Sequence, residues 1–176
     1  KDRAYAARVL NLFARKAFRR PTRDGEVERY LQLVDLAKAE GVESGVRLAL
    51  EAMLVSPTFL YREEPQPEPD NAERIHPVDE HSLATRLSYF FWSSMPDQRL
   101  IHLASRGDLR KQPASEIGRL VASPRSREFV SNFTGQWLDL RSIDATSPDM
   151  NLYPEFDEML KVAMVGETEA FFWEIL

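Results

Sequence analysis

Apolar residues recur every three or four positions through the first third of the chain, the spacing of a helix with one buried face. The pattern predicts a first helix over residues 3–18, ended by Pro21, because the residue before proline disfavours the helical region. Thr22 or Asp24 can cap a second helix, for which Gly41 is a natural end. The first helix carries most of its charged residues on the side away from its apolar stripe.

A third amphipathic helix is expected from near Ser44 to the Ser56-Pro57 pair, which ends it. Three short helices joined by brief connections predict one compact helical unit over residues 1–62. Residues 63–77 then contain four prolines among acidic side chains. That composition favours an extended linker, so we place a domain boundary there.

The pattern resumes in a second unit over residues 78–176, where Asp79 can cap a helix that Pro96 stops. Four apolar residues are expected to form the buried stripe of this helix: Leu83, Leu87, Phe90 and Phe91. Asp97 then caps a short helix that ends at Gly107. The helix is followed by another turn or two of apolar spacing.

Ser123-Pro124 combines a capping serine with proline in the first helical position, a strong start signal. The helix that follows carries Phe129, Phe133, Trp137 and Leu140. The last helix is expected from near Pro154, with its buried stripe formed by Phe156, Leu160, Ala163, Met164 and Phe171. The stripe runs on without a cap, so we expect the helix to continue in a longer protein.

No alternating apolar and polar stretch is long enough for a sheet, so the predicted fold class is all-α. We expect two small helical units, of three and then about four to five helices, packed together across the proline-rich linker. The longest apolar runs are too short to span a membrane.

Charge and cysteine content narrow the chemistry. The formal net charge of −5 over 176 residues disfavours a general binder of polyanions. The chain has no cysteine, which excludes disulfides, thiolate metal sites and covalent haem attachment within it. We therefore predict no cofactor in this segment.

The run from Ser88 to Asp97 contains four consecutive aromatic residues, a large apolar surface at one point. Trp92 lies on the flank of the expected stripe, and Trp137 is its expected neighbour on the facing helix. These two residues either fill the core or face a pocket or partner. Core packing is the favoured interpretation of the cluster as a whole.

Glu167 falls within the predicted apolar stripe of the last helix, between Met164 and Phe171. A buried carboxylate must be paired, protonated or bound to a ligand. Arg86 or Arg141 would supply a structural partner, and this interpretation is favoured over a catalytic acid. Arg86, Trp92, Trp137 and Glu167 are therefore the candidate pocket or interface residues, and no catalytic residue is predicted.

Two other clusters are weaker candidates. The basic run Arg15–Arg23 adjoins a three-helix unit and could contact phosphates, but the following helix is acidic. Glu73 and His76 spell one Glu-x-x-His string, and Asp79 and His81 follow it. Because di-iron bundles need that string twice on packed helices, no metal site is predicted.

The longer strings identify a family. Residues 7–62, including the string Phe13–Pro21, resemble the planctomycete-specific domain family of unknown function numbered five. Residues 79–174 resemble the family numbered four, through Leu83–Asp97, Asn132–Leu138 and the stretch from Phe156 to Glu169. Together the two resemblances cover nearly the whole chain.

The resemblance implies a larger, exported bacterial protein whose neighbouring domains include cytochrome-c-like modules that carry haem. It implies no activity and no catalytic residue. The leading hypothesis is therefore a helical scaffold or interaction module whose partners are other domains of the same protein. The alternatives are an enzyme domain with a pocket between the two units and, more weakly, nucleic-acid binding through Arg15–Arg23.

Overall fold

The computed structural model describes residues 2–145 and 147–176, and these residues form helices, turns and loops with no strand. The all-α prediction is confirmed. The chain divides into two compact units, one of Lys1–Leu87 with Met95–Pro113 and one of Ser88–Ser94 with Ala114–Leu176. The division falls within a helix rather than at the expected linker, and the domain boundaries proposed above remain a prediction.

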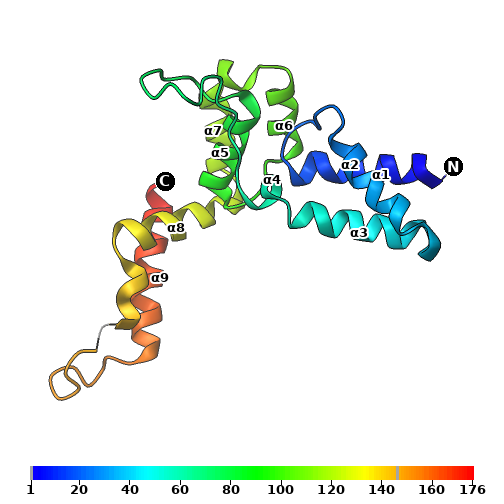
Figure 1. The fold of residues 1–176 in the computed structure, drawn as a ribbon. Helices are drawn as coiled ribbons and strands as arrows, with labels where there is room; N and C mark the ends of the chain where they lie inside the picture. The colour runs from blue at the N-terminus through cyan, green and yellow to red at the C-terminus, as the bar shows by residue number, and fades with distance from the viewer. Residues whose placement is uncertain (1, 146) are drawn as a thin grey trace. The chain divides into compact units, whose positions relative to one another are not determined.

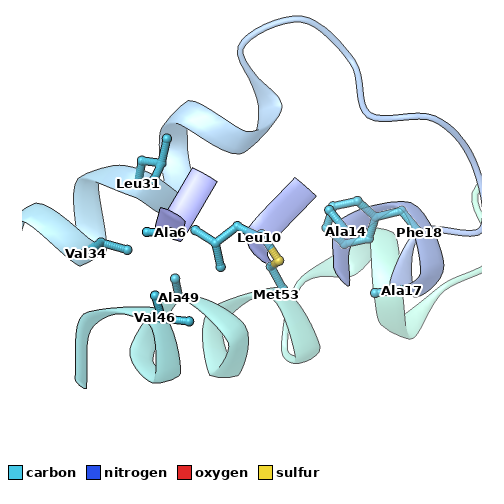
Figure 2. Close-up of a cluster of buried hydrophobic side chains, with 10 residues drawn as sticks. All are labelled: Ala6, Leu10, Ala14, Ala17, Phe18, Leu31, Val34, Val46, Ala49 and Met53. Atoms are coloured by element: carbon cyan, nitrogen blue, oxygen red, sulfur yellow. The ribbon is translucent and has the colours of Figure 1, made fainter. Parts of the chain in front are cut away.

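The first unit is built on three helices that lie side by side: α1 (Asp2–Ala17), α2 (Glu26–Leu36) and α3 (Val42–Leu54) (Figure 1). Their apolar faces meet in one cluster of buried side chains, shown in Figure 2. Leu10 and Met53 are wholly buried there. The helical spacing of these residues in the sequence is the physical reason that they reach one core.

Two details of these helices differ from the sequence prediction. α2 follows Gly25, and neither Thr22 nor Asp24 caps it; instead the Glu26 carboxylate accepts a hydrogen bond from the Arg23 backbone N–H at 2.9 Å. Gly41 precedes α3 with a φ of 97°, after a short 3₁₀ turn, η1 (Lys38–Glu40). A residue with a side chain would be strained at that φ.

α2 and α3 approach closely at Gly45. A Cβ atom added there would lie 2.8 Å from the Val34 Cα and 2.9 Å from the Val34 carbonyl oxygen. Only a residue without a side chain permits this separation of the two backbones.

The rest of the first unit contains α4 (Pro57–Leu60), α6 (Gln98–Ser105), η2 (Leu109–Lys111) and the first part of α5 (Glu80–Trp92). Asp79 caps α5 by accepting from the N–H groups of His81 and Ser82, and Asp97 caps α6 through the Leu100 N–H. Both caps are as predicted. Residues 63–77 form an irregular segment without a helix or strand.

The buried face of α5 is shifted from the predicted stripe. Ala84, Ser88, Phe91 and Trp92 are buried, whereas Phe90 is 57% exposed. Ala84 and Ser88 are each 0% exposed, so this face buries small side chains together with two large rings. A stripe chosen by hydrophobicity alone misses that face.

The second unit contains α7 (Pro113–Val121), η3 (Pro124–Ser126), α8 (Arg127–Trp137), η4 (Leu140–Ala145) and α9 (Glu158–Ile175). Ser123 caps η3 through the Arg125 N–H, as its sequence predicts. α9 runs back alongside α8 (Figure 1).

α9 presents a different face to α8 than expected. Phe172 and Trp173 contact residues of α8, whereas Met164 and Phe171 of the predicted stripe are exposed. The helix begins at Glu158, capped by Asp157, rather than near Pro154. Because α9 carries apolar residues on several sides, periodicity alone cannot determine which side is packed.

Candidate functional site

A row of aromatic rings follows α8. Phe129, Phe133 and Trp137 are spaced four residues apart, so their side chains lie on one side of the helix. The ring centroids are 5.3 Å apart for Phe129 and Phe133 and 5.5 Å apart for Phe133 and Trp137. Phe90, at the end of α5, joins the row with its centroid 5.0 Å from that of Phe129.

The rings become more exposed toward the end of α8. Phe129 is buried, Phe133 is 37% exposed and Trp137 is 65% exposed. We name the exposed members Phe90, Phe133 and Trp137 the aromatic strip. It rests on Phe129 and on Phe172 of α9, whose ring lies 5.6 Å from that of Phe133. The strip is therefore a braced surface rather than a set of isolated side chains.

Trp92 belongs to the core. It is 4% exposed, and its indole N–H donates to the carbonyl oxygen of Leu120 at 3.0 Å. The Arg125 guanidinium lies 4.4 Å from the ring centroid, within cation–π range. Among the described residues no ring contact joins Trp92 to Trp137, whose ring neighbour is Phe133.

Polar groups lie beside the strip, at the turn that ends α5. Ser93 has a φ of 50°, the left-handed conformation that often ends a helix. Its hydroxyl oxygen accepts a hydrogen bond from the Asn132 amide at 2.7 Å, and the carbonyl oxygen of that amide accepts one from Arg141 at 2.6 Å. Ser94 interacts in turn with the Arg125 guanidinium at 2.5 Å.

Glu167 lies on an exposed face of α9. The prediction that it lies in a buried stripe is wrong, because α9 packs through the side that carries Phe172. An exposed carboxylate is solvated by water and needs no buried partner. Both interpretations of Glu167, as a buried acid paired with an arginine and as a buried catalytic acid, required burial that the structure does not show.

Arg86 has a partner within the first unit. Its Nε and one Nη lie 2.6 Å and 2.5 Å from the two carboxylate oxygens of Glu64. The hydrogen bonds from Arg86 hold the pKa of Glu64 below its usual value. This forked pair ties α5 to the start of the irregular segment 63–77, and Arg86 is engaged in structure.

The basic run Arg15–Arg23 does not form a free cationic surface. Arg19 is buried and donates to backbone carbonyl oxygens near the end of α4. Arg20 makes two hydrogen bonds with Glu26, at 2.8 and 2.9 Å. Arg23 lies 3.5 Å from a Glu63 carboxylate oxygen. Three of the five cations are thus used internally, which leaves little for phosphates.

His76 and His81, from the weaker metal-site candidate, each lie beside a polar side chain of the first unit. The His76 Nε2 atom is buried without a hydrogen-bond partner, 3.6 Å from a Glu68 oxygen. His81 lies 3.3 Å from the Ser105 hydroxyl, and its burial lowers the pKa of its imidazole. Within residues 2–145 and 147–176, no three His, Asp or Glu side chains gather in a way that could hold a metal ion.

A small hollow lies between α8 and α9. It holds about 110 Å³ and is lined by residues that include Arg127, Glu169 and Trp173. The Arg127 guanidinium lies 4.9 Å from the Trp173 ring centroid. A cavity of this size is well below that of ordinary small-molecule sites, which occupy about 300–1,000 Å³.

Sequence reasoning identified Trp137 as a candidate but did not expect polar groups beside it. Arg141 entered only as a possible partner of Glu167 and Asn132 only as part of a family string, and Arg125 was missed. One signal was present: Gly135 lies inside a helical pattern, where glycine is unfavourable unless something requires it.

Two family models match successive parts of the chain. The family model PSD4, described as a protein of unknown function (DUF1592), matches residues 78–176, more than half of the chain. The chain belongs to this family. A second model, PSD5, a protein of unknown function (DUF1595), matches residues 5–64. The two predicted families and their order are thereby confirmed.

No curated protein and no solved structure matches the chain. The DUF1592 match contains α5 to α9, and so all of the aromatic strip. No helix in the described part of the chain is both long and apolar enough to cross a membrane.

Proposed function

We propose that this chain is a helical interaction module of a larger exported protein, and that its aromatic strip docks onto another domain of the same polypeptide. The observation that carries the proposal is the braced, exposed row of Phe90, Phe133 and Trp137. Contiguous exposed aromatic surface is typical of interaction sites. Tryptophan is also enriched among the residues that dominate binding energy.

Energetics favour a partner for this surface. Each large aromatic side chain can bury about 150–250 Å², and burial contributes roughly 25 cal/mol per Å². The rings of the strip are held by Phe129 and Phe172, so little side-chain freedom is lost on binding. A rigid, exposed and apolar row is therefore ready to bind without rearrangement.

The partner that we favour is another domain of the same polypeptide. Two family models match successive segments of one chain, which is the arrangement of a modular protein. The resemblance to planctomycete families adds export and haem-carrying neighbours to the proposal. Haem attachment would then lie in those neighbours, because these 176 residues contain no cysteine.

Site-specific photo-crosslinking tests the proposal. A photoreactive phenylalanine analogue replaces Trp137 in the full gene product, and the adduct is mapped by mass spectrometry. The matched control places the same analogue at Leu12 in α1, which is also 65% exposed. We expect the analogue at position 137 to form an adduct with another segment of the same polypeptide. The analogue at position 12 should form no specific adduct in the folded protein. Absence of a specific adduct at 137 contradicts the proposal.

A further inference from the structure

We propose that Arg125 and Arg141 form a carboxylate-binding clamp beside the aromatic strip, and that the segment that docks there is acidic and carries an apolar residue. This inference rests on the proposed function, because it names the chemistry of the partner. The two arginines are held in place, lack an acidic partner among the described residues, are joined by polar groups, and lie beside exposed aromatic rings.

Each arginine is held at two points. The Arg125 guanidinium stacks on Trp92, which is fixed by its bond to Leu120, and interacts with the Ser94 hydroxyl. The Arg141 guanidinium donates to Asn132, and its aliphatic stem crosses the face of Gly135. Side chains fixed in advance lose less entropy on binding than free ones.

Gly135 is the clearest sign that the position of Arg141 matters to the fold. A Cβ atom at this buried helical glycine would lie 3.1 Å from the Arg141 Nε and 3.5 Å from its Cγ. Glycine costs a helix interior about 1 kcal/mol relative to alanine. The glycine gives the arginine room, because the three atoms nearest to such a Cβ all belong to Arg141.

Neither guanidinium of the clamp has an acidic partner. In the part of the chain that the structure describes, no carboxylate lies within ion-pair distance of Arg125 or Arg141. By contrast Arg119, on the same unit, lies 2.8 Å from a Glu116 oxygen. A fork of five N–H donors that uses one or two of them retains capacity for a carboxylate.

The two arginines are joined by a short polar path. Arg125 contacts Ser94, Ser93 precedes it, and Asn132 links Ser93 to Arg141. Both cations thus flank one serine pair at the end of α5. A single segment with two carboxylates a few residues apart can reach both, since an extended chain advances about 3.3 Å per residue.

The surroundings favour an acidic peptide segment over a nucleic acid. Residues 114–176 contain five Lys and Arg against eleven Asp and Glu, so a polyphosphate backbone with a charge at every residue would meet more repulsion than a segment with two carboxylates. The strip beside the clamp is apolar and suits a hydrophobic side chain of the same segment. Two localised cations beside aromatic rings match a few carboxylates next to an apolar anchor.

A peptide titration tests the clamp. The probe is a fluorescein-labelled peptide of alternating Glu and Phe, compared with the matched Gln and Phe peptide by fluorescence anisotropy. We expect the acidic peptide to bind more tightly and to lose about tenfold in affinity with either Arg125→Gln or Arg141→Gln. The matched control, Arg127→Gln, removes an equal charge from an arginine outside the clamp and should leave the affinity unchanged.

Gly135→Ala provides a second variant that keeps both arginines. The new methyl group displaces the Arg141 stem, so affinity should fall without loss of charge. Combined with Arg141→Gln, it should cause no further loss. Circular dichroism of each variant verifies that the helices persist.

Several results would overturn the clamp. If the acidic peptide does not bind, or binds no more tightly than the Gln and Phe peptide, the clamp does not recognise carboxylates. If Arg127→Gln weakens binding as much as the clamp substitutions, the effect is one of general charge. Tighter, Arg125-dependent binding of a short oligothymidylate would indicate a nucleic acid. Arg125-dependent self-association in sedimentation would indicate a second copy.

The crosslink at position 137 separates this inference from the proposed function. An adduct whose yield is unchanged by Arg125→Gln leaves the docking function intact and contradicts the acidic partner. If no adduct forms, the proposed function fails first, and the clamp loses the partner on which it depends.

Discussion

The guanidinium of Arg19 donates to the carbonyl oxygen of Thr58 at 3.0 Å, and so ties the end of α1 to α4 across a sequence separation of 39 residues. The same Nη2 atom lies 3.2 Å and 3.3 Å from the carbonyl oxygens of Phe59 and Tyr61. Carbonyl groups at the end of a helix have no partners within it, and a cation there also meets the negative end of the helix dipole. Arg19, which the sequence places in a candidate phosphate-binding patch, therefore has a structural role.

Arg19→Ala should lower the free energy of unfolding by about 2–3 kcal/mol, because it removes a buried guanidinium and leaves the part-buried carbonyl oxygens of Thr58 and Phe59 without a charged donor. Arg15→Ala, which removes an exposed cation within α1, should change it by less than about 0.5 kcal/mol. Urea denaturation followed by circular dichroism measures both. Equal effects of the two substitutions would show that the carbonyl contacts do not contribute.

Gly45→Ala should destabilise the first unit by about 1–3 kcal/mol, because the added methyl meets the backbone of Val34, which cannot move independently of α2. Gly118→Ala in α7 is the matched control, since a Cβ atom there meets open space. That substitution should instead stabilise by up to about 1 kcal/mol, through helix propensity. Thermal unfolding of the two variants should therefore shift the midpoint in opposite directions.

Trp92→Phe should lower the free energy of unfolding by about 2–3 kcal/mol, because it removes a buried donor to Leu120 and leaves a small void. Trp137→Phe should change it by less than about 0.5 kcal/mol, since that ring is mostly exposed. The comparison by chemical denaturation separates the core tryptophan from the surface one. Similar losses would mean that Trp137 is also part of the core.

Stability should fall in two stages as the pH is lowered. Burial lowers the pKa of His81 below its ordinary value of 6.5, so below that pH the unfolded chain binds a proton that the folded chain resists. The free energy of unfolding should therefore begin to decrease as the pH falls below about 6.5. His81→Gln should remove this first stage from a series of urea titrations at different pH.

The second stage belongs to carboxylates. Burial acts to raise the pKa of Glu26, but hydrogen bonds from Arg20 and the Arg23 N–H outweigh it and hold the pKa below 4.5. Burial also acts to raise the pKa of Asp79, but hydrogen bonds from Ser82 and from the His81 N–H outweigh it and lower the pKa. Their stabilisation is present above the unfolded values and is lost as the pH falls through the folded ones. Glu26→Gln should reduce the drop below about pH 4.5, and an unchanged profile would contradict the role of this pair.

The sequence predicted those features that depend on a single helix and the residues next to it. Asp79, Asp97 and Ser123 cap the elements that follow them, because a capping bond involves only the next two or three residues. The first helices and their core also follow from periodicity, since each has a single apolar face. The candidate site was less accessible, because it depends on which face of α8 and α9 is covered.

The sequence by itself determined the helical class, the caps at Asp79, Asp97 and Ser123, the three-helix core of the first unit and membership of the family. Those properties follow from nearest neighbours along the chain and from amphipathic spacing. The tertiary structure decided that Trp92 is buried and Trp137 exposed, that Glu167 faces outward, and that Arg19 binds carbonyls rather than presenting charge. It also placed Arg125 and Arg141 beside one serine pair. The physical reason is that an apolar helix has more than one face it can bury, and only packing against a partner selects it.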